Sequence, residues 1–366
     1  IEFGTGSTTN LSISNNQIKI NNSNAAAGEV NGIKNDVQAT NLVMNANRVY
    51  DCNVPSATGI LRGILSQGNA GAGTNNITNN VLENSIITTT NPSFFGLGQY
   101  LSFASVANIN NNRISGNTFS SAATTLHLIN GNGSTTLTMN NNTVTNNKLS
   151  ATGANATINI LGGSTPANTT SLTVSGNQII NNRVLDPAAS TVVTFSGIGM
   201  LCKTPLANPA LISNNTIRKL SIGGVSTGIH NLSGISPAVA SGTLQSIYVE
   251  NNQVDSLYSD AVNTVVSGIN AYNSTSTAIM RKNKIHSLFP GTGANAKAVG
   301  IRVSPTYIDS IYNNFINLDL TKTFTPVAGY GSLSGTALST DTSLIGVWYE
   351  GGTSHRLLYN TIRLNG

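Results

Sequence analysis

Short stretches of alternating apolar and polar residues recur along the chain. Leu11-Ser12-Ile13, Leu137-Thr138-Met139, Leu172-Thr173-Val174 and Ile247-Tyr248-Val249 each place an apolar side chain at every second position. A strand with one buried face requires this period of two, because successive side chains on a strand point to opposite sides. The pattern therefore predicts a series of short, half-buried strands.

An asparagine follows these stretches and stands two positions ahead of an aliphatic residue, as in Asn16-Gln17-Ile18 and Asn112-Arg113-Ile114. Self-similarity at a period of 30 to 46 residues is typical of solenoids and arrays, whose units bury their apolar faces against their neighbours. The anchor asparagines are Asn16, Asn47, Asn79, Asn112, Asn142, Asn177, Asn215, Asn252, Asn283, Asn314 and Asn360.

A second marker, a glycine followed by an aliphatic residue, falls about midway between anchors. It occurs at Gly32, Gly63, Gly96, Gly197, Gly228, Gly268, Gly300 and Gly346. The middle repeats lack the glycine but still alternate, as in Thr157-Ile158-Asn159-Ile160. Each coil is therefore expected to hold three short strands: the alternating strand, a strand after the anchor turn, and the glycine strand.

The sharp bend at each anchor is expected to need a left-handed backbone, which asparagine tolerates better than other residues that carry a side chain. In stacked coils neighbouring amides would lie about 4.8 Å apart and could bond into a ladder along the axis. The aliphatic residues after the anchors would then stack inside: Ile18, Val49, Ile114, Val144, Ile179, Ile217, Val254, Ile285, Ile316 and Ile362.

With such a ladder at one turn, the chain resembles the right-handed parallel β-helix proteins of the pectin-lyase-like superfamily. The resemblance covers the chain from about Asn10 to Gly366. It implies one all-β domain, a right-handed parallel β-helix (solenoid) of about ten coils, most of them 30–38 residues long. It implies little about activity, because that superfamily includes lyases, hydrolases, phage tailspikes, adhesins and non-catalytic surface repeats.

Composition supports the same class. The 366 residues are 8% charged and 5% aromatic with 36 glycines, which favours strands and turns over helices. No apolar run approaches the length of a membrane span, and the 18 basic residues are scattered rather than clustered as in a nucleic-acid binder. We therefore expect no membrane insertion and no nucleic-acid partner. The Asn-rich style also resembles repeat regions of large secreted bacterial surface proteins.

The ends of the sequence suggest a larger parent chain. Residues 1–9 are interpreted as a processing or cloning-derived segment, and residues 10–366 as the β-helix domain. A solenoid needs capping units, and little sequence follows Asn360, so we expect the rest of a larger bacterial protein, extracellular or at the cell surface, as a partner. Cys52 and Cys202 lie in distant coils and are expected to be unpaired, buried and hydrophobic in character.

Groups that could support catalysis are dispersed. Glycoside hydrolysis needs two carboxyl groups roughly 5 to 9.5 Å apart. The nearest acidic residues in sequence are Glu250, Asp255 and Asp260 in one repeat, and Asp309 and Asp319 in another. The histidines, His127, His230, His286 and His355, show no metal-ligand spacing. We predict no catalytic residue, metal site or cofactor. A groove with two close carboxylates beside a basic residue would favour a polysaccharide lyase or glycoside hydrolase instead.

The glycine strand supplies the candidate binding residues. If the aliphatic residue after each glycine points inward, the following residue points outward, which places His230, Asn270, Arg302 and Trp348 in one column. Two positions further on lie Tyr272 and Glu350. Sugar rings stack on aromatic planes and their hydroxyls bind amide and charged groups. The resembled superfamily also holds carbohydrate on this sheet. The alternative is that Arg302 and Trp348 form only a cation–ring pair.

The long segment between Asn314 and Gly346 is a second candidate for binding, because loops at the edge of a rigid solenoid commonly carry such residues. Its distinctive side chains are Lys322, Phe324, Tyr330 and Asp341.

Three functional classes follow. The first is a non-catalytic structural or adhesive segment with weak binding to polysaccharide or cell-surface glycan. The second is a carbohydrate-active enzyme or sugar-binding module. The third is an ice-binding solenoid, which would need a flat, regular threonine array. Threonines near the anchors, such as Thr143, Thr145, Thr216 and Thr361, are interrupted by Gln, Arg, Lys and Phe, which disfavours the third class.

Overall fold

The structure is a computed structural model, and all of its described secondary-structure elements are β-strands. The described residues are 1–21, 30–57, 61–68, 73–89, 96–99, 105–121, 125–151, 155–164, 170–185, 192–204, 207–224, 228–239, 246–271, 277–291, 293, 295–303, 308–319, 343–350 and 354–365.

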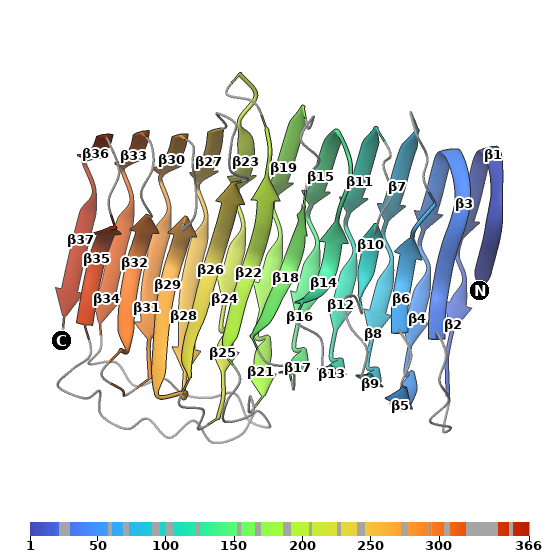
Figure 1. Ribbon diagram of the computed structural model, residues 1–366, viewed down its shortest axis with the longest axis horizontal. Helices are drawn as coiled ribbons and strands as arrows, with labels where there is room; N and C mark the ends of the chain where they lie inside the picture. Colours follow the sequence, from blue (N-terminus) through green and yellow to red (C-terminus); the bar gives the residue numbers. More distant parts are fainter. Residues whose placement is uncertain are drawn as a thin grey trace.

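The strands form two parallel sheets wound around one elongated core, with the two chain termini at opposite ends of the long axis (Figure 1). Each strand pairs in parallel with the equivalent strand of the next coil, as Ile285 does with Ile316. The prediction of an all-β parallel solenoid is confirmed.

The first sheet, sheet A, has 20 described strands and bends between two halves. β1 (Glu2–Ser14) and β3 (Val30–Asn45) run through both halves. The glycine-strand half contains β6 (Leu61–Ser66), β10 (Leu97–Gln99), β14 (Thr125–Gly131), β18 (Ala156–Ser164), β22 (Val193–Cys202), β26 (Ile229–Val239), β29 (Asn263–Ala271), β32 (Lys297–Val303) and β35 (Ser343–Tyr349). The half before the anchor turn contains β7 (Thr74–Thr78), β11 (Val106–Asn110), β15 (Thr136–Asn140), β19 (Ser171–Ser175), β23 (Ala210–Ser213), β27 (Ser246–Glu250), β30 (Thr277–Arg281), β33 (Ile308–Tyr312) and β36 (Ser354–Leu358).

The second sheet, sheet B, has 17 described strands. Those directly after the anchor turn are β2 (Gln17–Ile18), β4 (Arg48–Tyr50), β8 (Val81–Glu83), β12 (Arg113–Ser115), β16 (Thr143–Thr145), β20 (Gln178–Ile180), β24 (Thr216–Arg218), β28 (Gln253–Ser259), β31 (Lys284–Phe289), β34 (Phe315–Asp319) and β37 (Thr361–Asn365). A further set follows a second turn: β5 (Asn53–Ala57), β9 (Ile86–Thr89), β13 (Thr118–Ser121), β17 (Lys148–Ala151), β21 (Arg183–Leu185) and β25 (Ser221–Ile222).

The coils are less uniform than the expected array of about ten three-stranded coils. Coils near the C-terminus contain three strands, as in β31, β32 and β33. Coils in the middle contain four, as in β12, β13, β14 and β15, because the second turn divides the sheet-B segment. The predicted order of alternating strand, anchor turn, post-anchor strand and glycine strand is confirmed in both kinds of coil.

The anchor asparagines form a continuous hydrogen-bonded ladder. At a typical step, the backbone N–H and the side-chain Nδ2 of Asn215 both donate to Oδ1 of Asn252, at 3.0 and 2.9 Å, and Nδ2 also donates to the carbonyl oxygen of Val174 at 3.0 Å. One amide thus joins three coils. The ladder runs through Asn16, Asn47, Asn80, Asn112, Asn142, Asn177, Asn215, Asn252, Asn283, Asn314 and Asn360.

Two details of the predicted ladder are wrong. Its third member is Asn80, because Asn47 donates to Oδ1 of Asn80, whereas Asn79 is the preceding turn residue. The left-handed residue is also not the ladder asparagine but the one before it, with φ between 53° at Ala46 and 68° at Gly176. The bend and the ladder therefore require adjacent residues, and asparagine is common at both because it suits left-handed backbone and amide stacking for different reasons.

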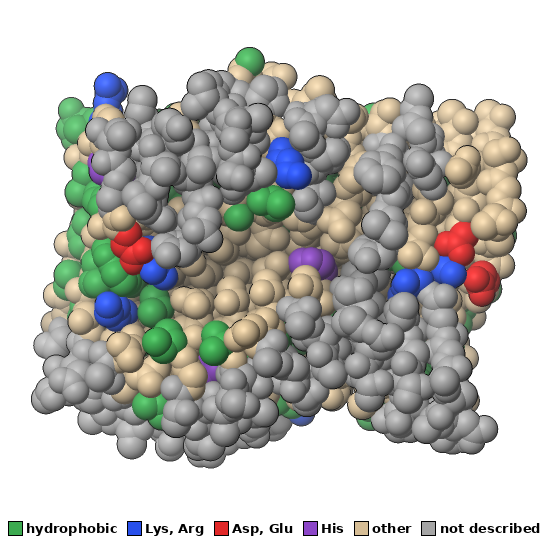
Figure 2. Space-filling model, viewed as in Figure 1, with side chains coloured by type: hydrophobic (Ala, Val, Ile, Leu, Met, Phe, Trp, Pro, Cys, Tyr) green, Lys and Arg blue, Asp and Glu red, His purple; other side chains and the backbone are tan. Residues whose placement is uncertain are grey.

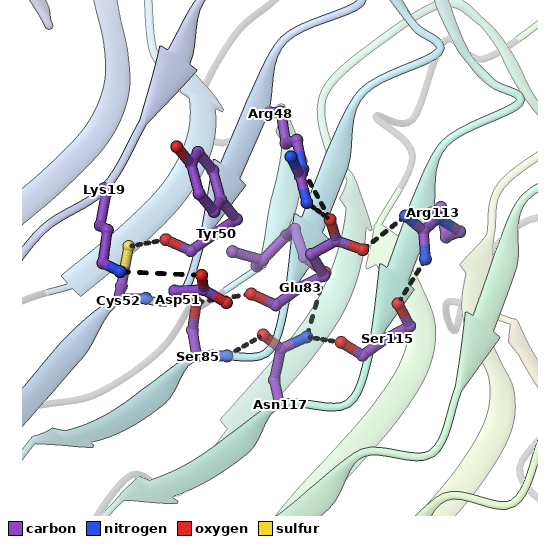
Figure 3. Close-up of polar contacts among 11 residues, drawn as sticks. Lys19, Arg48, Tyr50, Asp51, Cys52, Glu83, Ser85, Arg113, Ser115 and Asn117 are labelled. Carbon is purple, nitrogen blue, oxygen red and sulfur yellow. Dashed lines mark hydrogen bonds and ion pairs between the residues drawn. The ribbon is translucent and has the colours of Figure 1, made fainter.

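A second, shorter ladder lies at the second turn and was not predicted. Asn117 donates its backbone N–H and Nδ2 to Oδ1 of Asn147, and Asn147 donates both groups to Asn182. On the other side, the N–H of Ser85 donates to Oδ1 of Asn117 at 3.0 Å, and the N–H of Cys52 donates to Oγ of Ser85 at 3.1 Å (Figure 3). In coils nearer the C-terminus, buried leucines such as Leu257 and Leu288 occupy the equivalent position after this turn.

The core column predicted after the anchors is confirmed in the interior coils. Val49, Ile114, Val144, Ile179, Ile217, Val254, Ile285 and Ile316 are buried, together with Leu82, which follows the corrected anchor Asn80. Ile18 is half-buried and Ile362 is 39% exposed. These two side chains belong to the outermost described coils, so each is packed from one side only.

The recurring glycine has a packing role. A Cβ at Gly268 would lie 2.4 Å from Cγ2 of Ile285 in sheet B and 2.7 Å from the carbonyl oxygen of Gly300 in the next coil. No side chain fits there, so glycine lets the two sheets approach closely where the bulky core column lies between them.

Residues 2–9, expected to lie outside the solenoid, form the first part of β1, where Glu2 pairs with Lys34 of β3. The origin of this segment stays a prediction. Cys52 and Cys202 are both unpaired and buried, as predicted, and burial raises the pKa of Cys202 to about 12. Among the described residues no helix could cross a membrane.

Candidate ligand-binding face

The structure brings three of the predicted binding residues together. On the glycine-strand half of sheet A, Asn270 of β29 pairs with Arg302 of β32, and Arg302 pairs with Trp348 of β35. The three side chains therefore occupy equivalent positions in successive coils, about 4.8 Å apart. The 46-residue step between the last two anchors inserts no extra strand between Arg302 and Trp348.

Arg302 is the centre of this group. Its Nε and Nη2 donate to Oε1 of Glu350 at 3.0 and 2.8 Å, and its guanidinium carbon lies 4.7 Å from the centre of the Trp348 ring. Lys297, which sequence reasoning missed, places its Nζ 4.5 Å from the same ring centre. Strict alternation counted back from Arg302 turns Lys297 inward. Only a break in the period of two, since residues 298–301 of this strand are all buried, leaves Lys297 half-buried at the outer surface. The cation–ring pair considered as an alternative is present.

Asn270 carries an unused acceptor beside Arg302. The side chain is 8% exposed, and its Oδ1 is shielded from solvent without a hydrogen-bond donor among the described residues. A buried amide oxygen without a partner carries a free-energy penalty of about 1–3 kcal/mol. A ligand hydroxyl or a water molecule that donated to Oδ1 would remove that penalty.

His230 does not belong to this group, which corrects the prediction. It pairs with Thr264, is fully buried, and its Nδ1 accepts a hydrogen bond from the backbone N–H of Val193 at 3.0 Å. Burial lowers the pKa of its imidazole ring. The error arose from the choice of glycine: Ile235 pairs with Ile269, so Gly234 and not Gly228 is the equivalent of Gly268.

Tyr272 lies outside the described residues. The same is true of the candidates in the segment before Gly346, namely Lys322, Phe324, Tyr330 and Asp341.

The middle of the glycine-strand face is almost free of charge. Asn130, Gly162 and Gly199 occupy the column that continues to Asn270, and the His127 ring lies over Gly162, where a Cβ would come within 2.1 Å of Nδ1. Burial lowers the pKa of His127 to about 4. Figure 2 shows this face, with charged side chains grouped near both ends and a mostly uncharged floor between them.

A charged cluster lies at the N-terminal end of the same face. Nζ of Lys34 is 3.3 Å from Oε1 of Glu2 and 2.8 Å from Oδ2 of Asp36. The sequence patterns did not single out this cluster, because residues 1–9, which include Glu2, were expected to lie outside the β-helix domain. The cluster thus supplies the two carboxylates beside one basic residue that the enzyme alternative requires, although the Glu2 side chain is 58% exposed and no groove is described around it.

Other described carboxylates are engaged by cations on sheet B. Glu83 bridges Arg48 and Arg113 across three coils, each at 2.5 Å (Figure 3). Burial opposes ionisation of Glu83, but hydrogen bonds and charge from the two arginines outweigh it and hold the pKa below its usual value. Asp255 contacts Arg218 at 3.1 Å and His286 at 2.9 Å.

Asp255 and the other acidic residues of its repeat have different partners. Glu250 pairs with Arg281, and Asp260 accepts a 2.5 Å hydrogen bond from the hydroxyl of Tyr258. Asp319 is bonded by Asn365 at 3.2 Å, and the side chain of Asp309 lies outside the described residues. In the described part of the chain no group of three or more His, Cys, Asp or Glu side chains could hold a metal ion.

The threonines near the anchors lie on the outer surface of sheet B and are interrupted as expected. Thr143 stands between Arg113 and Gln178, and Phe315 precedes Thr361 in the same column.

Comparison with known proteins gives no relative on which to base a function: no family model, curated protein or solved structure matches the chain.

Proposed function

We propose that the chain is a non-catalytic structural and adhesive segment of a secreted or cell-surface protein, which binds polysaccharide or cell-surface glycan weakly. The proposed site is the group of Asn270, Lys297, Arg302, Trp348 and Glu350, called here the tryptophan patch. The observation that carries the proposal is the stacking of Asn270, Arg302 and Trp348 in consecutive coils with Glu350 bonded to Arg302.

Each group in the tryptophan patch has a role that suits a sugar. The half-buried Trp348 ring supplies an aromatic plane, and Oδ1 of Asn270 can accept a bond from a hydroxyl. Arg302 and Glu350 hold each other in place, which lowers the entropy cost of ordering them around a ligand. Because cations already lie over the Trp348 ring, the area left for stacking is limited, and we expect weak affinity.

A structural role is supported by the two amide ladders, which fix the coils through buried hydrogen bonds. A non-catalytic role is supported by the pairing of Glu83, Glu250, Asp255 and Glu350 with arginines. A carboxylate held by a guanidinium is stabilised in its charged form and is a poor proton donor at neutral pH.

Tryptophan fluorescence tests the site, because Trp348 is the single tryptophan of the chain. Titration with soluble oligosaccharides should shift its emission in a saturable way, and Arg302→Ala should abolish the shift. Arg218→Ala is the matched control, since it removes an arginine–carboxylate pair on sheet B. Saturable binding without change at Trp348, or equal loss in both variants, would place the site elsewhere.

The Lys34 cluster supports one alternative, a polysaccharide-active enzyme, because Glu2 and Asp36 converge on one ammonium group. We expect no release of reducing sugar or unsaturated uronate from common polysaccharides. Activity that disappears in Asp36→Asn, but not in Asp255→Asn, would establish catalysis at this end of the face.

A further inference from the structure

A third surface has a composition unlike the rest of the molecule. It consists of the outward side chains of the half of sheet A before the anchor turn, from residues 10–14 of β1 and 41–45 of β3 through β7, β11, β15 and β19. All these side chains are Asn, Ser or Thr except Val43 and Val106. We call it the Asn/Thr face. Toward the C-terminus the same half of the sheet becomes charged and aromatic, with Tyr248, Glu250 and Arg281.

The Asn/Thr face is a regular lattice. Its strands pair without a register shift, as Asn45 does with Thr78 and Thr78 with Asn110. Between β11 and β15 the backbone pairing ends at Asn108 and Thr138, and the N–H of Asn140 donates to Oδ1 of Asn110 at 2.8 Å. Neighbouring coils place equivalent side chains about 4.8 Å apart, and alternate residues along a strand are about 6.7 Å apart. Three outward columns across six coils therefore form a nearly rectangular grid.

Hydrogen bonds between side chains hold this grid. Asn108 donates from Nδ2 to Oδ1 of Asn76 at 2.8 Å and accepts at Oδ1 from the hydroxyl of Thr138, also at 2.8 Å. In a second column, Thr78 donates to Oδ1 of Asn45 at 3.0 Å. These bonds restrict the side-chain rotamers, so a partner would find the groups already ordered.

Several partner classes do not fit this face. Six coils and five residues per strand cover about 500 Å², less than the roughly 800 Å² per partner of a stable protein interface. Aromatic and arginine anchors, which dominate protein interfaces, are missing from the described outward positions of these strands. The same positions offer no cations for phosphates and no rings on which a single sugar chain could stack.

A partner with a periodic, uncharged surface of donors and acceptors fits all these features. Hydroxyl and amide groups each donate and accept, as water molecules do, and the methyl groups of threonine and valine add small apolar points between them. From the grid, its rigidity and its lack of charge, we infer that the Asn/Thr face binds ice. The oxygen lattice of ice repeats at distances comparable to those of the grid. This binding is separate from the glycan contact proposed for the tryptophan patch, which lies on another face.

The experiment uses the whole chain with substitutions at the centre and outside the face. Thr138→Lys places a long cation in the middle of the grid, and Thr173→Lys does the same one coil further on. Thr145→Lys is the control, because Thr145 is also a half-buried outward threonine but lies on sheet B. Circular dichroism melts identify any variant that fails to fold.

Partition into a slowly growing ice phase and inhibition of ice recrystallisation are measured for each folded protein. The unmodified chain and Thr145→Lys should enter ice and restrict crystal growth. Each of the two grid variants should need at least a tenfold higher protein concentration to inhibit recrystallisation to the same extent. Exclusion of the unmodified chain from ice would overturn the inference, as would equal loss in the control. Binding to crystalline chitin or cellulose, or dimer formation seen by light scattering, would also overturn the inference if Thr138→Lys abolished that binding or dimer and left partition into ice unchanged.

Discussion

Asn79 and Asn80 are adjacent in the sequence but have different structural roles. Asn79 has a left-handed backbone with φ of 58°, and its side chain is at the surface, where Nδ2 bonds to Asn45. Asn80 is fully buried and accepts two hydrogen bonds from Asn47, each of 3.0 Å. The turn thus separates a residue selected for backbone conformation from one selected for its amide.

This difference predicts opposite responses to substitution. Asn80→Ala removes the shared acceptor of two buried donors on Asn47, and each unsatisfied group costs about 1–3 kcal/mol, so we expect a loss of about 3 kcal/mol or more in unfolding free energy. Asn79→Gly keeps the left-handed backbone accessible and should change stability by less than about 1 kcal/mol. Chemical denaturation of both variants measures the contrast, and similar losses would contradict the assignment of the ladder.

The core column predicts a similar contrast at neighbouring residues. Ile217→Asp buries an unpaired charge between two apolar layers and should cost about 4 kcal/mol or more. Thr216→Asp places the same side chain outward on β24 and should be nearly neutral. Thermal melting distinguishes the two, and an unchanged melting temperature for Ile217→Asp would show that the register is wrong.

The glycine marker predicts that even a methyl group is harmful. Gly268→Ala would bring Cβ within 2.4 Å of Ile285 and 2.7 Å of a backbone oxygen, and overpacking of this kind costs about 1–3 kcal/mol. A Cβ at Gly4 would meet no atom within 4 Å, so Gly4→Ala supplies the control. Equal stability of Gly268→Ala and Gly4→Ala would mean that the sheets can separate there at little cost.

Acid should weaken the fold through Asp255. Burial raises the pKa of this carboxyl, but hydrogen bonds from His286, Ser256 and Arg218 and the charge of His286 outweigh burial and lower it to about 2. Because the folded pKa lies below the unfolded value, the stabilisation is complete above about pH 4 and is lost as the pH falls toward 2. It amounts to about 2 kcal/mol. Between pH 6 and pH 2 the unfolding free energy of Asp255→Asn should therefore fall by about 2 kcal/mol less than that of the unmodified protein. The same pH dependence in both proteins would contradict the network around Asp255.

The buried thiol predicts slow labelling. With its pKa raised to about 12, Cys202 holds almost no thiolate at neutral pH and is shielded from reagents. We expect negligible reaction with a soluble disulfide reagent in the native protein and full reaction after unfolding in denaturant. Rapid native labelling of Cys202, measured with Cys52→Ser as the background, would indicate that the interior opens.

The sequence was informative wherever one residue type repeated in one setting. The anchors and the aliphatic residues after them predicted the strand order and most of the core, because a parallel solenoid repeats the same environment in every coil. Prediction was less accurate where two equivalent residues were adjacent or nearby. Asn79 and Asn80 both fit the anchor pattern, and only the ladder bonds distinguish them.

The candidate site shows the same limit. Gly228 and Gly234 both precede an isoleucine, and the prediction took Gly228 as the recurring glycine. That choice placed His230 in the binding column, whereas its side chain is buried in the structure. The second ladder escaped notice because its turn is occupied by cysteine, serine and asparagine in different coils and by leucine further on. At this turn either a hydrogen-bonding side chain or a bulky apolar one is compatible with the same bend. No single residue type therefore recurs in the sequence.

The anchor ladder also determines how the molecule would respond to mechanical load. Its bonds run parallel to the long axis and join each coil only to adjacent coils, so tension between the two termini would detach coils one at a time from an end. Each detached coil would release 30 to 46 residues, or about 100 to 165 Å of extended chain. Under tension the stack would therefore lengthen in steps, and it would shorten as coils wound back onto the remaining ones.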